Sequence, residues 1–385
     1  MDVQLLSGVS SLGTAYSAQQ VLSRLFAPSG KETYVFYLLD FSKRFKSDLT
    51  PLVSAGATPS VEHDTTRAVK RTLSFSVRGD ANINVLRDLI QPRYRLFMPD
   101  GGYLEWPLGT FTVIPPGRDI MPAQTWLQFQ LPDVTQLLVD AAFTSTYTAP
   151  AGASYVVTIQ DIVTSANLPT PLPVSIVDPG TKVPATLTWE YGTSRLQAIN
   201  DLLAAISYFP LWADEKGTLR SRQIPDWNTV TPSVTFDATG SQSTITVEMT
   251  ETADISQAYN QILVVGEDPR RNVVTGLYVN DNAASAVSTV NWHPKLQVVR
   301  DSSVPDVSTA VLKAKAIAQQ AARIFTQLQM NTLAWPVSQD NDIYGVAYQS
   351  RDEGLVTGSY VEVGWTMQAA TGGLTEHRLT RIVPA

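Results

Sequence analysis

The chain has 385 residues, of which 44% are hydrophobic and 16% are charged, and none is cysteine. The lack of cysteine excludes a disulfide framework, a thiol nucleophile and a thiolate metal site. With 28 basic and 35 acidic residues, the net charge of −7 argues against a dedicated nucleic-acid binder that neutralises phosphates. The length suggests about two or three domains, each able to bury a core, and the many Thr, Ser, Val and Pro residues favour sheet over helix.

Residues 1–30 form a leader rich in Ser and Gly. Within it, residues 18–26 are predicted to form a short helix, which we expect to dock on the chain's own first domain rather than on a partner. No basic and apolar signal segment opens the sequence, and the densest apolar stretch, residues 34–39, is far too short to cross a bilayer. We therefore expect a soluble chain with no membrane span, which begins in a cytoplasm.

Residues 31–125 have the pattern of a small β-barrel or sandwich with one helix. Residues 72–77 alternate between apolar and polar side chains, as strands do in a sheet with one buried face. A short helix is predicted at residues 82–90, and further strands at residues 33–41, 94–98, 103–106 and 109–114. Prolines and glycine at residues 115–117 and Pro122 then interrupt the pattern, so we place a domain boundary near residue 125.

Residues 191–222 are predicted to form a helix followed by a hairpin. Apolar residues at helical spacing run from Leu196 to Ile206, after a cap at Thr193 or Ser194. Pro210 cannot continue a helix, and Gly217 stands where a hairpin turn requires positive φ.

The predicted hairpin has a composition that suits single-stranded nucleic acid. Its basic and aromatic residues are Lys216, Arg220, Arg222, Phe209 and Trp212. However, Asp214 and Glu215 lie in the same turn, and the preceding helix needs an apolar cover. We therefore interpret the aromatic residues as core.

The remainder of the chain is predicted to be rich in strands, with two further helices. The helices are expected at residues 159–166 and 306–325, the second capped by Asp306 and lined by alanine, which permits close packing. Strands are expected at residues 126–131, 243–249, 260–267, 332–337, 360–365 and 378–383. No repeat of fixed short period is predicted.

The sequence offers few candidates for chemistry. His63, His293 and His377 each lack acidic or histidine partners at ligand spacing, so we predict no zinc site and interpret them as core or surface residues. The paired carboxylates Glu251 with Asp254 and Asp352 with Glu353 are interpreted as solvated charge. We predict no catalytic, cofactor-binding or metal-binding residue.

Four short motifs fall short of the functional patterns that they resemble. Residues 8–13 miss the spacing of a nucleophile elbow, and residues 29–32 lack the upstream glycine and following Ser or Thr of a phosphate loop. Residues 340–345 lack the distal Glu of a calcium loop and are predicted to form a polar turn. Residues 78–80 spell Arg-Gly-Asp, which turn chemistry explains, with Asp80 as the cap of the helix that follows.

The order of the elements resembles that of the baseplate or tail hub proteins of tailed bacteriophages, which have relatives in contractile injection systems. The resemblance covers about residues 30–385 and lies in the collinear order of patterns of residue types. The segments that carry it are Arg71–Val77, Tyr94–Phe97, Trp106–Val113, Gly192–Thr193, Phe209–Leu219 and Tyr259–Gly266, followed by the alanine-rich helix and the closing strands.

The resemblance implies a mainly β fold with α+β parts, in which two tail-tube-like β-barrel domains enclose small α/β domains. Residues 1–30 would be the leader and residues 31–125 the first barrel. Residues 126–155 would begin the second barrel, residues 156–240 would be the intervening α/β domain, and residues 241–385 would complete the second barrel with the long alanine-rich helix.

The resemblance also implies assembly within a virion. Three copies would form a homotrimeric ring of six barrels that matches the sixfold tail tube, with the tube, distal tail, tip or fibre and tape measure proteins as partners. Phage DNA would pass through the lumen without specific binding. An adhesin that binds the host surface and a tail-associated hydrolase are the alternatives, and no length after Ala385 is expected to supply a wall-digesting module.

Overall fold

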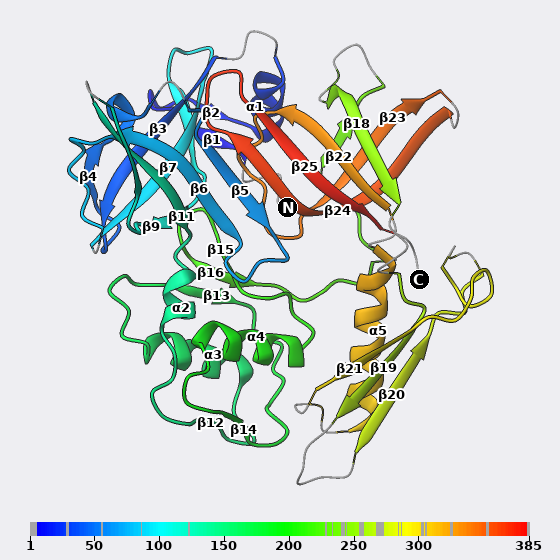
Figure 1. The fold of residues 1–385 in the computed structure, drawn as a ribbon. Helices are drawn as coiled ribbons and strands as arrows, with labels where there is room; N and C mark the ends of the chain where they lie inside the picture. Colours follow the sequence, from blue (N-terminus) through cyan, green and yellow to red (C-terminus); the bar gives the residue numbers. More distant parts are fainter. Residues whose placement is uncertain are drawn as a thin grey trace.

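A computed structural model shows how these patterns fold. It describes residues 6–27, 31–54, 57–85, 87–121, 124–227, 229–232, 234–239, 243, 245–253, 258–266, 273–283, 285, 287–301, 304, 306–323, 326–351 and 354–382. Strands predominate over helices in these segments, which confirms the predicted class of a mainly β fold with α+β parts. A β-rich body lies at the top of Figure 1, and two small α/β units hang side by side below it.

The smaller sheet of the body comes from the first part of the chain. β3 (Lys31–Asp40) pairs along its whole length with β7 (Asp88–Phe97), and the neighbouring strands are β4 (Phe45–Asp48), β8 (Tyr103–Pro107) and β9 (Phe111–Thr112). A short turn of 3-10 helix, Thr50–Leu52, follows β4. The tight turn between β7 and β8 uses Gly101 at a φ of 83°, as expected for the predicted hairpin.

The N-terminal helix packs on this body, as predicted. A hairpin of β1 (Gly8–Val9) and β2 (Ala15–Tyr16) leads into α1 (Ala18–Leu25), which Ser17 caps by accepting from the amide of Gln20. Val21 and Leu25 are buried in the body core, and Arg24 Nε donates to the carbonyl of Phe97 at 2.9 Å.

The larger sheet of the body draws strands from both ends of the chain. In spatial order its main path is β10 (Gly117–Ile120), β11 (Thr125–Pro132), β6 (Arg71–Arg78), β5 (Ser60–Asp64), β24 (Gly354–Gln368), β25 (Leu374–Arg381), β22 (Thr326–Leu333) and β18 (Ile245–Ala253). β23 (Ile343–Ser350) pairs with β24, and β17 (Val234–Asp237) pairs with β23. The long strand β24 pairs with β23 through its first half and with β5 through its last residues. It also pairs with β25.

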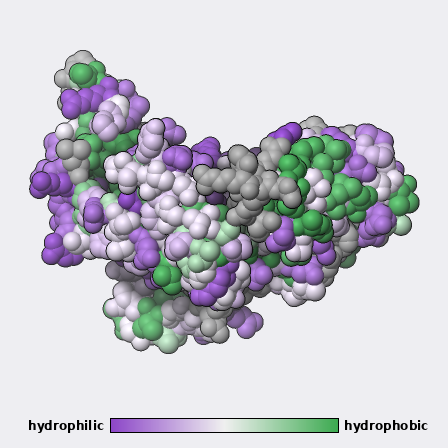
Figure 2. Space-filling view, turned by 90° about the horizontal axis from the view of Figure 1, so that it is seen from below, coloured by the Kyte–Doolittle hydropathy of each residue, from purple (hydrophilic) through white to green (hydrophobic). Residues whose placement is uncertain are grey.

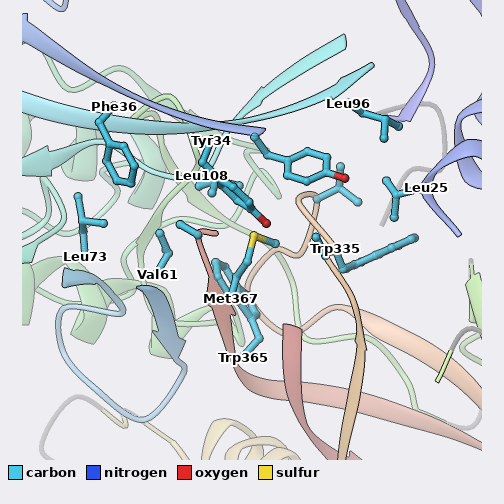
Figure 3. Close-up of a cluster of buried hydrophobic side chains, with 14 of the residues drawn as sticks. Leu25, Tyr34, Phe36, Val61, Leu73, Leu96, Leu108, Trp335, Trp365 and Met367 are labelled. Carbon is cyan, nitrogen blue, oxygen red and sulfur yellow. The ribbon is translucent and has the colours of Figure 1, made fainter. Parts of the chain in front are cut away.

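The two halves of the body share one hydrophobic core. Figure 3 shows side chains from the first half, such as Tyr34, Phe36 and Leu73, in the same cluster as Trp335, Trp365 and Met367 from the second. The boundary predicted near residue 125 falls inside the β10–β11 hairpin. β11 is also the direct antiparallel neighbour of β6 in the sheet. The assignment of residues to two barrel domains otherwise stays a prediction.

Residues 133–232 form the first small unit, which we call the helical unit. Its elements are α2 (Gln136–Asp140), β12 (Tyr147–Ala149), α3 (Tyr155–Thr164), β13 (Val174–Ile176), β14 (Leu187–Trp189), α4 (Arg195–Ala205), β15 (Trp212–Ala213) and β16 (Leu219–Ser221). The predicted helix and hairpin of residues 191–222 are confirmed as α4, which Ser194 caps, and the β15–β16 hairpin. α3 begins four residues before the predicted start because Ser154 caps it by accepting from the amide of Val157.

The helical unit contains an internal repeat of two copies, which the prediction of no repeat of fixed short period did not address. β12 and α3 recur later in the chain as β14 and α4, with Ser154 and Ser194 as equivalent caps. The two copies are in direct contact, because β12 pairs antiparallel with β14. The two copies share identical residues, as at Ser154 and Ser194, and bury similar residues at the same positions, as at Ile162 and Leu202.

Residues 258–323 form the second small unit, which we call the sheet–helix unit. β19 (Gln261–Gly266) lies between β20 (Val274–Val279) and β21 (Leu296–Arg300), antiparallel to the first and parallel to the second. α5 (Val307–Arg323) covers one face of this sheet. The prediction of a capped, alanine-lined helix is confirmed, because Asp306 accepts from the amide of Thr309 and buried Ala310 and Ala314 face the strands. Residues 324–325 of the prediction lie outside the described residues.

Three local predictions are wrong in part. Residues 82–85 and 87 form irregular backbone, and residues 88–90 begin β7, because Leu89 and Ile90 are both fully buried against β3. The strand predicted at residues 332–337 ends at Leu333, since β22 lies earlier in the sequence. The strand predicted at residues 109–114 is reduced to β9.

Candidate functional site

The most strongly charged buried site lies where the helical unit meets the body. The carboxylate of Asp340 is fully buried, and Lys70 Nζ contacts its Oδ2 at 2.8 Å while His63 Nε2 contacts its Oδ1 at 3.0 Å. Asn341 Nδ2 donates to Oδ2 at 2.7 Å, and Lys70 Nζ also reaches the carbonyl of Pro210 at 3.4 Å. The cluster therefore joins β5, the segment before β6, the turn before β23 and the hairpin segment of the helical unit.

Opposite charges decide the protonation of this cluster. Burial by itself raises the pKa of Asp340, but the charge of Lys70 and the hydrogen bond from His63 outweigh it, so the pKa lies well below its usual range. Burial lowers the pKa of His63, more than Asp340 raises it. Asp340 is therefore ionised and His63 neutral near pH 7, and their contact holds β5 against the turn before β23.

Arg71 extends the junction on its other side. Its side chain is buried, and its NH2 group donates to the carbonyl of Ser338 at 3.1 Å. Its backbone amide donates to Oδ2 of Asp133 at 3.1 Å, and the other oxygen of Asp133 accepts from the amide of Thr135 at 2.7 Å. Because Asp133 opens the helical unit, these bonds hold the start of that unit against β6.

The hairpin tip fits into a socket on the body. Lys43 Nζ donates to the carbonyls of Lys216 and Gly217 at 3.2 and 3.1 Å. Gln339 Nε2 donates to Glu215 Oε2 at 2.9 Å, and an NH2 proton of Arg222 bonds the carbonyl of Asp340 at 2.5 Å. Several residues of the body thereby hold the hairpin.

The basic tip considered for nucleic acid is mostly engaged within the chain. Arg220 pairs with Asp214 at 2.7 Å, and Arg222 also approaches Asp342 at 3.4 Å. Phe209 and Trp212 are buried, which confirms their interpretation as core. The tip therefore connects the helical unit to the body within one chain.

A second buried pair lies deeper in the body. His377 Nδ1 and Glu362 Oε1 are 2.5 Å apart, both residues are fully buried, and Thr332 Oγ1 contacts His377 Nε2 at 2.9 Å. Burial raises the pKa of Glu362, although His377 opposes the shift. The pair links β24, β25 and β22 across the sheet.

The remaining predicted residues fall in different places. His293 is exposed beside Trp292. Of the polar turn predicted at residues 340–345, only residues 340–341 form a turn, with Asn341 at a φ of 55°, because β23 begins at Ile343. Residues 78–80 form a turn in which Arg78 pairs with Asp80 at 2.6 Å; the helix that Asp80 was expected to cap is absent from the described residues after it. Asp254, the pair at residues 352–353 and residues 29–30 lie outside the described residues.

Sequence reasoning did not find this junction. Lys70 and His63 are 270 and 277 residues from Asp340, so no local spacing signals the cluster. In the segments that the structure describes, no group of three or more His, Cys, Asp or Glu side chains could hold a metal ion. No described helix is long and apolar enough to cross a membrane.

The fold is similar to that of solved tail proteins. The tail protein from Neisseria meningitidis MC58 matches with a TM-score of 0.64 at 12% identity, over 90% of this chain and 96% of that one. The prophage MuSo2 43 kDa tail protein from Shewanella oneidensis matches with a TM-score of 0.60 at 8% identity, over 91% and 98%. The prophage tail protein gp18 from Listeria monocytogenes EGD-e matches with a TM-score of 0.56 at 12% identity, over 90% and 94%. No protein-family model and no curated protein sequence matches the chain.

Proposed function

We propose that this chain, which has the fold of phage and prophage tail proteins, is a structural hub at the distal end of a bacteriophage tail. Three copies form a ring that joins the sixfold tail tube to threefold tip components and surrounds the passage for DNA. The observation that carries this proposal is the extent of the likeness, which covers 90% of this chain and 96% of the Neisseria tail protein.

The body has features that suit a ring component. Its two halves are already joined edge to edge, because Gly364–Gln368 of β24 pairs with Ser60–Asp64 of β5. A ring of three chains would then need one further joint per chain. Closed rings satisfy exposed strand edges without producing open fibres.

The charge of the chain suits a passage for DNA. Residues 1–120 carry 13 basic and 11 acidic side chains, whereas the remainder carries 15 basic and 24 acidic ones. A lumen that passes a polyanion should avoid dense Lys and Arg contacts, which produce strong and salt-sensitive binding. The acidic excess after residue 120 favours passage of DNA without tight binding.

The test is the symmetry and position of this chain in an intact particle. Cryo-electron microscopy of the parent virion should show three copies in a ring at the end of the tail tube. A sixfold ring of this chain, or its presence only in peripheral fibres, would contradict the hub assignment. The second outcome would favour the adhesin alternative.

The hydrolase alternative has its own assay. The two buried histidines are paired with carboxylates, His63 with Asp340 and His377 with Glu362. We expect the purified chain to release neither reducing sugar nor free amines from bacterial cell walls. Loss of turbidity in a cell-wall suspension, at a rate proportional to the concentration of the pure chain, would contradict the structural role.

A further inference from the structure

The two faces of the β20–β19–β21 sheet have different surroundings. One face packs on α5, where Ile262 and Val264 meet the alanines of the helix. The contact is close, because a Cβ atom at Gly276 would collide with the backbone of Ala310 and Val311. This face of the sheet is therefore covered by α5 of the same chain.

The opposite face, which we call the open face, is apolar. Register and side-chain alternation place nine residues on it in three cross-strand rows. The rows are Val279–Gln261–Leu296, Leu277–Leu263–Val298 and Thr275–Val265–Arg300. Six of these nine are aliphatic, and Leu277, Leu296 and Val298 are about half exposed, at 51%, 48% and 48%.

Such a face is unusual for a sheet in water. Sheets covered on one side normally present polar residues on the other, and contiguous exposed apolar patches mark interaction sites. Figure 2 shows hydrophobic surface gathered at the right of the view, over the part of the molecule that contains the sheet–helix unit.

The chain's own helical unit lies on the far side of α5. A cleft between the two small units is lined by Tyr155 and Lys182 from the helical unit, and by Asp306, Leu312 and Lys313 from the start of α5. The first turns of α5 thus stand between the helical unit and the sheet, and the open face points away from that unit. Neither α5 nor the described part of the helical unit therefore covers the open face.

The helical unit also exposes large hydrophobic residues. In the described part of the unit they are Val157, Val177 and Tyr191, at 51%, 78% and 73%. Each has an acidic neighbour: Asp161 lies one helical turn after Val157, and Asp178 and Glu190 are adjacent in sequence to the other two.

The two units also differ in net charge. Residues 133–232 contain nine acidic and five basic side chains, whereas residues 258–323 contain five acidic and seven basic ones. Opposite charges favour contact between unlike units, and like charges disfavour contact between two copies of the same unit.

We propose that the open face of one copy binds the helical unit of a second copy of this chain. The contact joins two different surfaces, so its repetition closes into a ring or runs on as a filament. The number of copies in the ring rests on the proposed hub function, whereas the pairing of surfaces rests on the exposed residues and charges alone.

Sedimentation of the full chain over a concentration series tests the pairing. The wild-type chain should self-associate, and Leu277→Asp with Val298→Asp should weaken association by at least about tenfold, because the contact would bury two carboxylates against a unit with an acidic excess. Leu355→Asp is the matched control, since Leu355 is exposed to 62% on β24, outside the open face. A wild-type chain that stays monomeric throughout, or equal association by the double variant, would overturn the proposal.

The absence of cysteine allows a second test by cross-linking. Leu277→Cys and Tyr191→Cys in one chain should form disulfides between copies under mild oxidation, whereas Leu355→Cys with Tyr191→Cys should not. Cross-linking of Leu277→Cys alone would show that the open face binds itself and would overturn the pairing.

The two tests separate this inference from the hub function. A threefold ring in the particle whose open face contacts no other copy would refute the inference and leave the hub function standing. Specific cross-links in a chain located outside the tail hub would support the inference and refute the hub function.

Discussion

Gly152 and Gly192 hold equivalent positions in the two copies of the repeat, with φ angles of 85° and 86°. The amide of Gly152 donates to the carbonyl of Val183, and the amide of Gly192 donates to that of Phe143, both at 2.8 Å. The sequence spacing from Phe143 to Val183 equals the spacing from Gly152 to Gly192. Each copy of the repeat therefore bonds the other in the same way, so the helical unit has approximate twofold symmetry within one chain.

The repeat predicts that both caps contribute to stability, and Ser154 Oγ in addition donates to Asp178 Oδ2 at 2.9 Å. Ser154→Ala and Ser194→Ala each remove a side chain that accepts from a backbone amide at a helix start, and each should lower the free energy of unfolding by about 1 kcal/mol. Urea unfolding measures both, with Ser145→Ala, an exposed position before β12, as a control expected within about 0.5 kcal/mol of wild type. A loss from only one cap would show that the two copies differ in stability.

Gly217 tests the fit of the hairpin into its socket. Its φ of 75° resists a β-branched side chain, and a Cβ atom there would lie 3.3 Å from Val134 and 3.4 Å from Thr110. Gly217→Val should therefore cost about 1 to 3 kcal/mol of stability and reduce particle yield.

Gly180→Val is the matched control for that substitution. Gly180 has a φ of 76°, but a Cβ atom there would meet nothing within 4 Å, so the variant experiences backbone strain without crowding. Thermal unfolding should rank Gly217→Val below Gly180→Val. Equal melting temperatures for the two variants would mean that the socket yields to the new side chain.

Local patterns predicted much of the fold. Strict alternation in β6, the turn residues of the β15–β16 hairpin and the cap of α5 each identified an element from the sequence. Prediction failed where tertiary pairing overrides local spacing. Residues 83, 86 and 90 have helical spacing, yet Leu89 and Ile90 are adjacent, fully buried strand residues, because the core of the body and the core of the helical unit cover opposite faces of β7.

The junction could not be predicted, because its members are distant in sequence. Lys70, His63 and Asp340 meet only after β5, β6 and β23 have taken their places in one sheet. Each residue type is ordinary where it stands in the sequence. The informative feature is the burial of three ionisable groups together, and burial of this kind appears only in the folded chain.

Two neighbouring arginines of the hairpin should differ in importance. Arg222 bonds the carbonyl of Asp340 on the body, whereas Arg220 pairs with Asp214 within the hairpin itself. Arg222→Ala should lower the free energy of unfolding by about 1.5 to 3 kcal/mol, because a charged hydrogen bond across the junction is lost. Arg220→Ala removes a partly exposed ion pair and should cost less than about 1 kcal/mol. Urea unfolding of both variants checks the order, and a larger loss from Arg220→Ala would mean that the tip is not held through Arg222.

The free energy of unfolding should decrease as the pH is lowered, because His63 is buried in a neutral state. Burial holds its folded pKa below the ordinary value of about 6.5, so the unfolded chain binds more protons than the folded chain below that pH. The contribution of His63 is therefore complete above about pH 6.5 and is lost as the pH falls further. Asp340, whose folded pKa is lowered, adds a second loss only below about pH 4.

His63→Gln isolates this effect, because an amide can still donate to Asp340 without titrating. The free energy of unfolding should decrease from pH 7 to pH 5 more steeply in the wild type than in His63→Gln, by up to about 1.4 kcal/mol per pH unit. Glu362 acts with the opposite sign, since its raised pKa favours the folded state as the pH falls, but it is present in both proteins and cancels in the comparison. Urea unfolding at half-unit pH steps measures the two slopes. Parallel slopes would show that His63 is protonated in the folded chain, and Asp340 would then hold a buried imidazolium beside Lys70.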